Sequence, residues 1–189
     1  MGAYINIGNA GFKSALRSEF VDKTGLIAEI NNTLFSENRF TCVSRCRRFG
    51  KSLAAKMLCA YYDRSCDSRE LFKGLEIESH PSFEKHLNKY PVIYVDMTRF
   101  ITDFGHEDNI VDHIQASLIS DLKKAYPQVE LSDSPRIMDI LDELHTTLGD
   151  QFVVIIDEWD AICREFDSES IAMRDYVNLL RRMFKSEDA

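Results

Sequence analysis

Residues 40–62 read FTCVSRCRRFGKSLAAKMLCAYY and predict a strand, a turn and a helix in succession. Residues 40–44 are rich in β-favouring side chains, and we expect a strand there. Residues 52–62 are apolar almost all round, which predicts a buried helix. The tripeptide Gly-Lys-Ser at residues 50–52 stands where the strand would meet the helix. A glycine, a lysine and a hydroxyl at such a junction are typical of a phosphate-binding loop.

A phosphate-binding loop gathers backbone N–H groups around an anion at the start of a helix. Gly50 would let the chain come close to the anion, Lys51 would meet the β- and γ-phosphates, and the Ser52 hydroxyl would bind magnesium. The usual pattern has its first glycine at position 45, where this chain has Arg45. The alternative is a turn that contains Gly-Lys-Ser by chance. The strand expected before the tripeptide and the helix after it favour the phosphate loop.

A second motif lies in residues 151–157, QFVVIID, which predict another strand. Its apolar residues are consecutive, as in a strand of a parallel sheet that is covered on both faces. Asp157 and Glu158 lie at its end, at the sheet edge where open α/β folds bind ligands. In a nucleotide site Asp157 would hold magnesium together with Ser52, and Glu158 would orient and deprotonate the attacking water. The alternative is an acidic strand end exposed to solvent.

The rest of the chain predicts one more strand and three helices. Residues 91–97 predict a strand. Asp96 near its end is a weaker candidate of the same kind as Asp157, and we interpret it rather as an ordinary strand terminus. One helix is expected over residues 112–126, and a second from an N-cap at Ser134 to Gly149. A third is expected near the end of the chain, with an apolar face formed by Ile171, Val177, Leu180 and Phe184. Strands that alternate with helices predict an α/β fold with a parallel sheet flanked by helices.

The composition limits the classes of protein. The chain has 189 residues, 44 % of them hydrophobic, which is enough for one folded domain. Its net charge of -8 argues against a surface built as a whole to bind nucleic acid. The five cysteines show no metal-site spacing with each other or with histidines, so we expect reduced thiols and no zinc. Neither a signal peptide nor a stretch long enough for a bilayer is present, so we expect a cytoplasmic protein without membrane contact.

A basic cluster interrupts this acidic composition. Arg45, Arg47, Arg48 and Lys51 lie close together in the expected phosphate loop. Such a cluster creates a local field suited to a polyphosphate. Three roles stay open for the arginines: a phosphate contact, a contact between subunits, or a contact with nucleic acid.

These motifs resemble the predicted AAA-ATPase-like proteins of bacteria and archaea, whose phosphate loop is of the type SRPRRFGKS. Residues 44–52 read SRCRRFGKS, so Arg45 agrees with that family and Cys46 replaces its usual proline. Residues 20–24, FVDKT, resemble a Tyr/Phe-Val-Asp-Lys-Thr box in the family's opening segment. Later blocks also resemble the family, including VVIIDEWD at residues 153–160.

The resemblance implies a P-loop NTPase domain of the additional-strand-catalytic-glutamate division over residues 1–189, with a helical segment at 1–36 and the core at 37–189. Lys51 and Ser52 would be its Walker A pair, and Asp157 and Glu158 its Walker B pair. Catalysis would rest on Glu158 and Lys51, and magnesium on Ser52 and Asp157. The residues expected to bind ATP are Arg45, Arg47, Arg48, Phe49, Gly50, Lys51, Ser52 and Leu53.

The opening box is open to two interpretations. The resemblance suggests that Asp22 and Lys23 pack near the nucleotide. From the residues alone, they could equally form the first turn of a surface helix.

Length is the main departure from the family. Its members continue past the position of Ala189, often into a PD-(D/E)xK nuclease-like domain, and a later strand lies between the phosphate-loop strand and the Walker B strand. We therefore expect a chain that is truncated at its C-terminal end and a sheet that is incomplete; the alternative is a sheet that closes differently. A second copy of the chain, a C-terminal domain or a partner chain would complete that sheet.

The expected function is binding and hydrolysis of Mg-ATP that drives or gates an attached or partner activity, on nucleic acid or in defence. One alternative is a nucleotide-sensing switch that binds ATP with little turnover. Another is a nucleic-acid-binding adaptor that uses the arginines, which the acidic composition disfavours.

Overall fold

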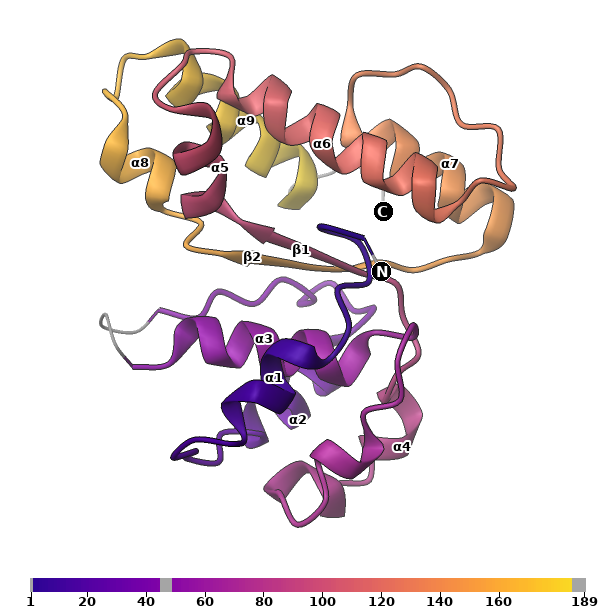
Figure 1. Cartoon of the computed structure of the whole chain (residues 1–189). Helices are drawn as coiled ribbons and strands as arrows, with labels where there is room; N and C mark the ends of the chain where they lie inside the picture. Colours follow the sequence, from indigo (N-terminus) through magenta and orange to yellow (C-terminus); the bar gives the residue numbers. More distant parts are fainter. Residues whose placement is uncertain (1, 45–48, 185–189) are drawn as a thin grey trace. The chain divides into compact units, whose positions relative to one another are not determined.

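The computed structural model describes residues 2–44 and 49–184 (Figure 1). The chain forms a mixture of helices and strands in which helices predominate. In chain order the elements are α1 (Ala10–Ala15), α2 (Gly25–Thr33), α3 (Lys51–Tyr62), the 3₁₀ turns η1 (Arg69–Leu71) and η2 (Glu76–Ser79), α4 (Phe83–His86), β1 (Val92–Asp96), α5 (Met97–Phe104), α6 (Ile110–Ala125), α7 (Ile137–Leu148), β2 (Val153–Asp157), α8 (Ala161–Glu165) and α9 (Ile171–Phe184).

The chain divides into two compact units, and the division passes through both strands. The first unit contains Asn6–Tyr94 and Phe152–Ile155. The second contains Gly2–Ile5, Val95–Gln151 and the chain from Ile156 onward. Helices α1 to α4 therefore belong to the first unit, and helices α5 to α9 to the second.

The two strands form a small parallel sheet in which β1 and β2 are neighbours. Both were predicted, and this sheet agrees with the α/β class. The predicted burial of β2 on both faces is wrong, because Val153 to Ile156 are only half-buried and Asp157 alone is buried. In the described residues β2 pairs with one strand, β1, so its other edge lacks the neighbour that a central strand would have.

The strand predicted at residues 40–44 is also wrong. These residues form neither strand nor helix, and all five are exposed. The β-propensity of a short segment reflects packing against neighbouring strands rather than a backbone preference of its own. The sheet of the described residues consists of β1 and β2 alone, so this segment takes no place in it.

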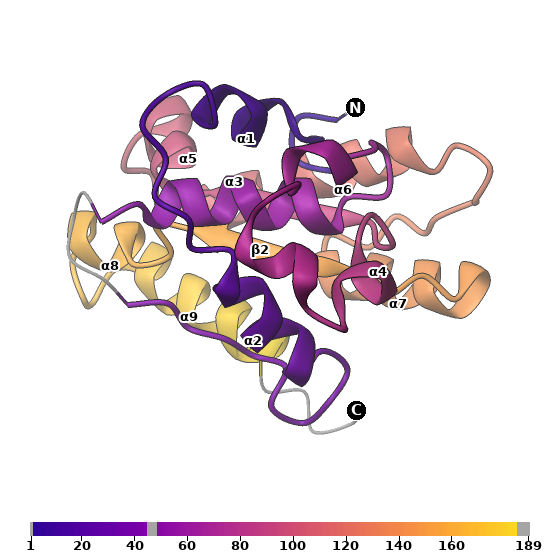
Figure 2. The same cartoon turned by 90° about the horizontal axis from the view of Figure 1, so that it is seen from below.

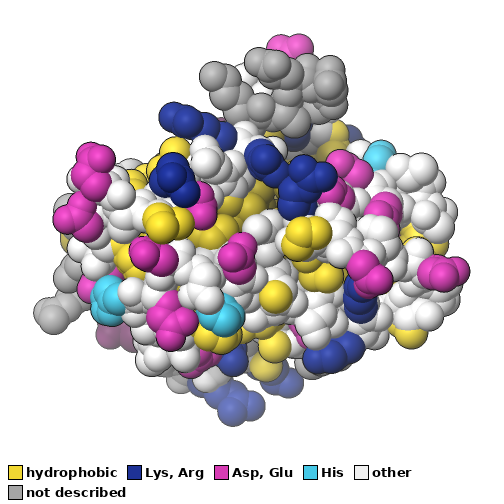
Figure 3. All heavy atoms as spheres, turned by 90° about the horizontal axis from the view of Figure 1, so that it is seen from above, with side chains coloured by type: hydrophobic (Ala, Val, Ile, Leu, Met, Phe, Trp, Pro, Cys, Tyr) yellow, Lys and Arg dark blue, Asp and Glu magenta, His cyan; other side chains and the backbone are white. Residues whose placement is uncertain are grey.

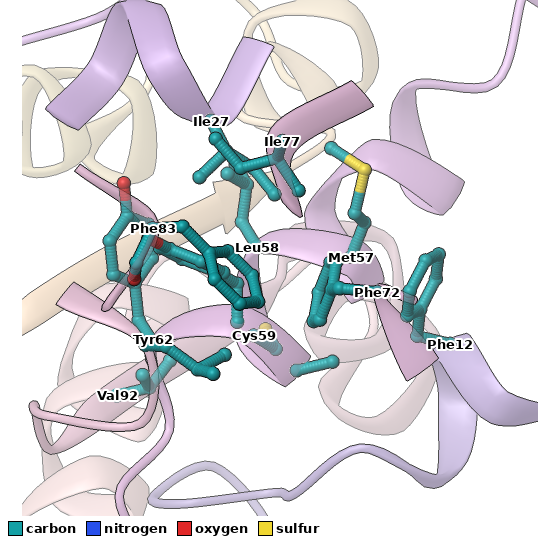
Figure 4. Close-up of a cluster of buried hydrophobic side chains, with 13 residues drawn as sticks. Phe12, Ile27, Met57, Leu58, Cys59, Tyr62, Phe72, Ile77, Phe83 and Val92 are labelled. Atoms are coloured by element: carbon teal, nitrogen blue, oxygen red, sulfur yellow. The ribbon is translucent and has the colours of Figure 1, made fainter. Parts of the chain in front are cut away.

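The core of the first unit is built around α3, as the apolar pattern predicted (Figure 4). The second half of α3 is buried, and Tyr61 and Tyr62 are among the largest fully buried side chains of the described residues. Phe72 stacks on Phe12 with ring centroids 5.2 Å apart and meets Tyr61 edge-on at 5.5 Å. Each such aromatic ring contributes about 1.5–3 kcal/mol by leaving water. Helix α1 lies alongside α3 in Figures 1 and 2.

The polar groups in this core are hydrogen-bonded. The Tyr62 hydroxyl donates to Asn31 Oδ1 at 2.8 Å, and Asn31 Nδ2 donates to the Tyr61 hydroxyl at 3.1 Å. Because a buried polar group without a partner is costly, these bonds fix the position of α2 beside α3.

The second unit is organised around α6, which packs against α5, α7 and α9. Asp121 of α6 is buried and accepts hydrogen bonds from the backbone N–H groups of Tyr4 and Ile5, at 2.9 and 3.0 Å. These bonds tie Gly2–Ile5 to the second unit. The predicted helix over residues 112–126 is thus confirmed as α6.

Helix α7 ends as predicted but does not begin as predicted. Gly149 follows its last residue in a left-handed conformation, with φ 72°. The N-cap is Arg136 and not Ser134, whose hydroxyl instead donates to Asp139 at 2.6 Å and accepts the Arg136 N–H at 3.2 Å. Ser134 thus contacts the first turn from outside the helix. Serine hydroxyls commonly form such local bonds with nearby backbone N–H groups instead of continuing a helix.

Helix α9 is confirmed, but its buried face is not the predicted one. Its buried residues are Ala172, Tyr176 and Leu179, whereas Ile171 and Phe184 are 48 % and 41 % exposed. The Tyr176 hydroxyl donates to the Trp159 carbonyl at 2.6 Å. An aromatic ring with a polar tip thus occupies the core position, which the apolar pattern alone did not indicate.

Candidate functional site

The segment Phe49–Ser52, which we call the GKS segment, opens α3. Gly50 is the N-cap of this helix, with φ 80° and ψ 26°. This left-handed conformation strains any residue with a side chain, which explains the glycine. Lys51 and Ser52 are the first two residues of α3, and the Gly50 carbonyl accepts the Ala54 N–H at 2.9 Å.

The start of α3 has the chemistry of an anion site. The first N–H groups of a helix have no partner within the helix, and a glycine N-cap offers no side chain to bond them. The helix dipole also favours a negative charge there. Lys51 and Leu53 are half-buried and Ser52 is exposed, so this end of the helix is open to a ligand. Arg45, Arg47 and Arg48, which were expected to bind ATP, lie outside the described residues.

The opening box lies against the GKS segment. Lys23 Nζ donates a hydrogen bond to the Phe49 carbonyl at 2.9 Å. Asp22 and Lys23 precede α2, whose N-cap is Thr24, so the interpretation as the first turn of a surface helix is wrong. Asp22 Oδ1 accepts the Thr24 N–H and hydroxyl, as in the turns that Asp side chains commonly cap.

Asp22 also ties this turn to η2. Its Oδ2 accepts the Glu76 N–H at 2.8 Å, and the Thr24 hydroxyl accepts the Ile77 N–H at 3.1 Å. Partial burial tends to raise the pKa of Asp22, but hydrogen bonds from the Thr24 and Glu76 backbone outweigh it and lower that pKa. Asp22 therefore stays ionised and holds the turn at neutral pH.

The acidic strand end lies in the second unit. Asp157 is the last residue of β2 and is only 6 % exposed. Glu158 follows with φ 51°, a left-handed conformation that is uncommon for a residue other than glycine. Its N–H donates to Asp157 Oδ1 at 3.1 Å. A strained backbone of this kind tends to occur at functional sites.

Arg164 of α8 holds the Glu158 side chain. Its guanidinium donates to Glu158 Oε2 at 3.0 Å and also pairs with Asp160. The hydrogen bond from Arg164 to Asp160, followed by the bond to Glu158, raises the pKa of Arg164, so the arginine is always charged. Sequence reasoning missed this residue, although the i,i+4 spacing of Asp160 and Arg164 on a helix is a signal that could have indicated part of the cluster.

The two halves of the expected site belong to different units. Lys51 and Ser52 are neighbours in the first, and Asp157 and Glu158 are neighbours in the second. The expected magnesium pair of Ser52 and Asp157 therefore stays a prediction.

Asp96 has a structural role at the end of β1. Its carboxylate accepts the Thr98 and Arg99 N–H groups at 3.0 and 3.3 Å and so caps α5. This agrees with the interpretation of Asp96 as an ordinary strand terminus.

The described part of the chain shows neither a metal cluster nor a membrane-spanning helix. Residues 2–44 and 49–184 contain no group of three His, Cys, Asp or Glu side chains arranged around a metal position. The cysteines in these ranges, Cys42, Cys59, Cys66 and Cys163, are free thiols. No described helix is both long and apolar enough to span a membrane.

A family model described as predicted AAA-ATPase matches residues 7–187. The chain belongs to this AAA-ATPase-like family. Membership in the AAA-ATPase-like family indicates nucleotide binding or hydrolysis, usually with Mg²⁺. No curated protein and no solved structure matches the chain.

The residues present fit a magnesium nucleotide. The uncapped start of α3 and the Lys51 ammonium suit phosphate oxygens. A serine hydroxyl and an ionised aspartate supply the oxygen ligands that Mg²⁺ prefers. Ser52, the second residue of α3, and Asp157, the last residue of β2, are residues of these types.

Proposed function

We propose that this chain is a P-loop ATPase domain of the additional-strand-catalytic-glutamate type that binds Mg-ATP and hydrolyses it. The observation that carries the proposal is the start of α3, where left-handed Gly50 leads directly into Lys51 and Ser52. Membership in the predicted AAA-ATPase family supports it. Hydrolysis would drive or gate an attached or partner activity, and residues 1–189 would form one ATPase domain whose sheet another chain or domain completes.

Each candidate residue has a distinct task in this proposal. The N–H groups at the start of α3 bind phosphate oxygens, and Lys51 neutralises the β- and γ-phosphates. Ser52 and Asp157 would hold Mg²⁺, which when bound neutralises charge on the phosphates. Glu158 orients a water molecule and accepts its proton. The Glu158 Oε2 atom is engaged by Arg164, so proton transfer uses Oε1 or requires this ion pair to open.

A nucleotide-sensing switch is the second candidate, and the Arg164–Glu158 ion pair favours it. The Arg164 guanidinium occupies Glu158 Oε2, and this oxygen accepts no proton from water while the ion pair is closed. If the pair stays closed, the domain binds ATP with little turnover and reports nucleotide occupancy to a partner.

Titration calorimetry with ATP, with and without Mg²⁺, tests the proposal on the wild-type chain, Lys51→Ala and Lys73→Ala. Lys73 is the matched control, because it is an exposed lysine of the first unit whose only ion pair in the described residues is a 3.8 Å contact with Glu70. We expect magnesium-dependent binding in the wild type and in Lys73→Ala, and a loss of affinity of about a hundredfold in Lys51→Ala, as for a charged hydrogen bond.

A folded wild-type chain that releases no binding heat, or equal affinities in Lys51→Ala and wild type, would contradict the proposed nucleotide site.

A further inference from the structure

The contact between Lys23 and the GKS segment links two motifs that are distant in the sequence. The Lys23 ammonium lies 2.9 Å from the Phe49 carbonyl oxygen. It also lies 3.4 Å from the position that a Cβ at Gly50 would take. A second positive charge besides Lys51 therefore stands beside the residue that caps α3.

The backbone of Lys23 is held firmly on both sides. Asp22 accepts hydrogen bonds from Thr24 and from Glu76 of η2, and the Thr24 hydroxyl accepts one from Ile77. The Lys23 carbonyl accepts the Leu26 N–H in the turn before α2. Because the backbone is ordered by these bonds, the contact with Phe49 costs only the conformational entropy of one side chain.

The position of the contact determines what it can do. The Phe49 carbonyl belongs to the peptide that joins Phe49 to Gly50, so a bond to its oxygen restrains the orientation of that peptide plane. The N–H of the same peptide belongs to Gly50, and the N–H groups of α3 follow directly. A restraint here therefore keeps the start of α3 in the left-handed entry that leaves its N–H groups available to an anion.

We propose that Lys23 is a positioning residue of the nucleotide site. Its ammonium holds the Phe49 carbonyl and so preorganises the GKS segment for a phosphate, with the turn of Asp22 and Thr24 as its support. The identity of the ligand rests on the proposed function, whereas the effect of Lys23 on the segment does not. Preorganisation raises affinity because the ordering cost is met before the ligand arrives.

The test compares wild type, Lys23→Met, Lys23→Arg and Lys73→Met. Methionine keeps an unbranched side chain and removes the charge and the donors, whereas arginine keeps both. Lys73→Met is the matched control for removing an exposed lysine of the first unit. Hydrogen exchange of the Ala54 amide, which donates to the Gly50 carbonyl in the first turn of α3, is measured without nucleotide, and ATP affinity is measured by calorimetry.

We expect faster exchange of the Ala54 amide in Lys23→Met alone, with an ATP dissociation constant raised roughly three- to tenfold, as for one exposed charged hydrogen bond. Lys23→Arg should largely keep the wild-type exchange rate and the wild-type ATP affinity. Lys73→Met should behave as wild type in both measurements. An unchanged melting temperature in Lys23→Met separates the positioning of the GKS segment from a general contribution to stability. If the methionine variant does not fold, Lys23→Arg keeps the test valid.

Exchange in Lys23→Met equal to wild type would overturn the inference, as would unchanged ATP affinity of this variant when the wild type binds. If the wild type binds no ATP, the proposed function fails. The exchange comparison alone then tests whether Lys23 holds the GKS segment.

Discussion

At the scale of single residues, the Glu158 carboxylate is under two constraints. Its backbone is left-handed, and its side chain is paired with Arg164. Both side chains are about one-third exposed, with values of 29 % for Glu158 and 31 % for Arg164, so solvent screens the pair. The pair is thus weak enough to open during a catalytic cycle, and it is the contact by which turnover would be restrained.

Replacing Arg164 by methionine is therefore expected to speed ATP hydrolysis. Glu158 Oε2 no longer has to leave the guanidinium before it can accept a proton, and an exposed ion pair worth about 0.2–1 kcal/mol corresponds to a rise of up to about fivefold. Steady-state phosphate release at saturating Mg-ATP measures it. Arg174→Met is the control, because it removes an arginine of the same unit from an ion pair, the more exposed pair with Asp175, that does not involve Glu158.

Glu158→Gln is expected to abolish turnover in both the wild-type and the Arg164→Met backgrounds while ATP still binds. A lower rate in Arg164→Met would show instead that the arginine positions Glu158 for reaction. Rates near zero in all variants would favour the nucleotide-sensing switch.

At the scale of elements, the end of a helix can be predicted from the sequence when the backbone conformation of a single residue determines it. Gly149 ends α7 because a left-handed backbone with φ 72° is allowed for glycine and costs other residues free energy. Within residues 2–44 and 49–184, no atom beyond the glycine and its two chain neighbours lies within 4 Å of the position of a Cβ at Gly149, so backbone strain is what opposes a side chain there.

Gly149→Ala should therefore lower the free energy of unfolding by about 1 kcal/mol, the usual cost of a left-handed alanine. Urea denaturation followed by circular dichroism measures this change. Gly149→Asn is the matched variant and should lose less, because asparagine tolerates this conformation better. Equal losses in the two variants, or none, would mean that α7 does not depend on this cap.

At the scale of the whole molecule, the two strands connect the units through the chain itself. Val92–Tyr94 and Val153–Ile155 belong to the first unit, while the last two residues of each strand belong to the second. Unfolding of either unit therefore disrupts strands that the other unit shares.

We expect the chain to unfold in one cooperative step in urea. Trp159, the single tryptophan, reports on the second unit by fluorescence, and far-ultraviolet circular dichroism reports on the helices of both units. Coincident midpoints are the expected result. Two separated transitions would show that the units are independent in stability.

The distribution of surface charge also belongs to this scale. On the face in Figure 3, basic side chains lie among acidic and apolar ones rather than in a continuous stripe. The nucleic-acid-binding adaptor, which the net charge of -8 disfavours, gains no support from this face.

The sequence by itself determined the features that depend on neighbouring residues along the chain. These include strands β1 and β2, the buried helix α3 and the end of α7, because periodicity and backbone preference act locally. The family followed from the same local motifs. The residue types of the expected nucleotide site could also be predicted from these local motifs. That these residues act together at one site stays a prediction.

Only the tertiary structure decided the features that depend on distant partners. Residues 40–44 favour β structure but take no place in a sheet of β1 and β2. Lys23 reaches Phe49, and Arg164 engages Glu158, because folding brings those side chains within hydrogen-bond distance. A propensity or a charge is a property of one residue, whereas a strand pair or a hydrogen bond needs two groups whose positions the whole fold sets.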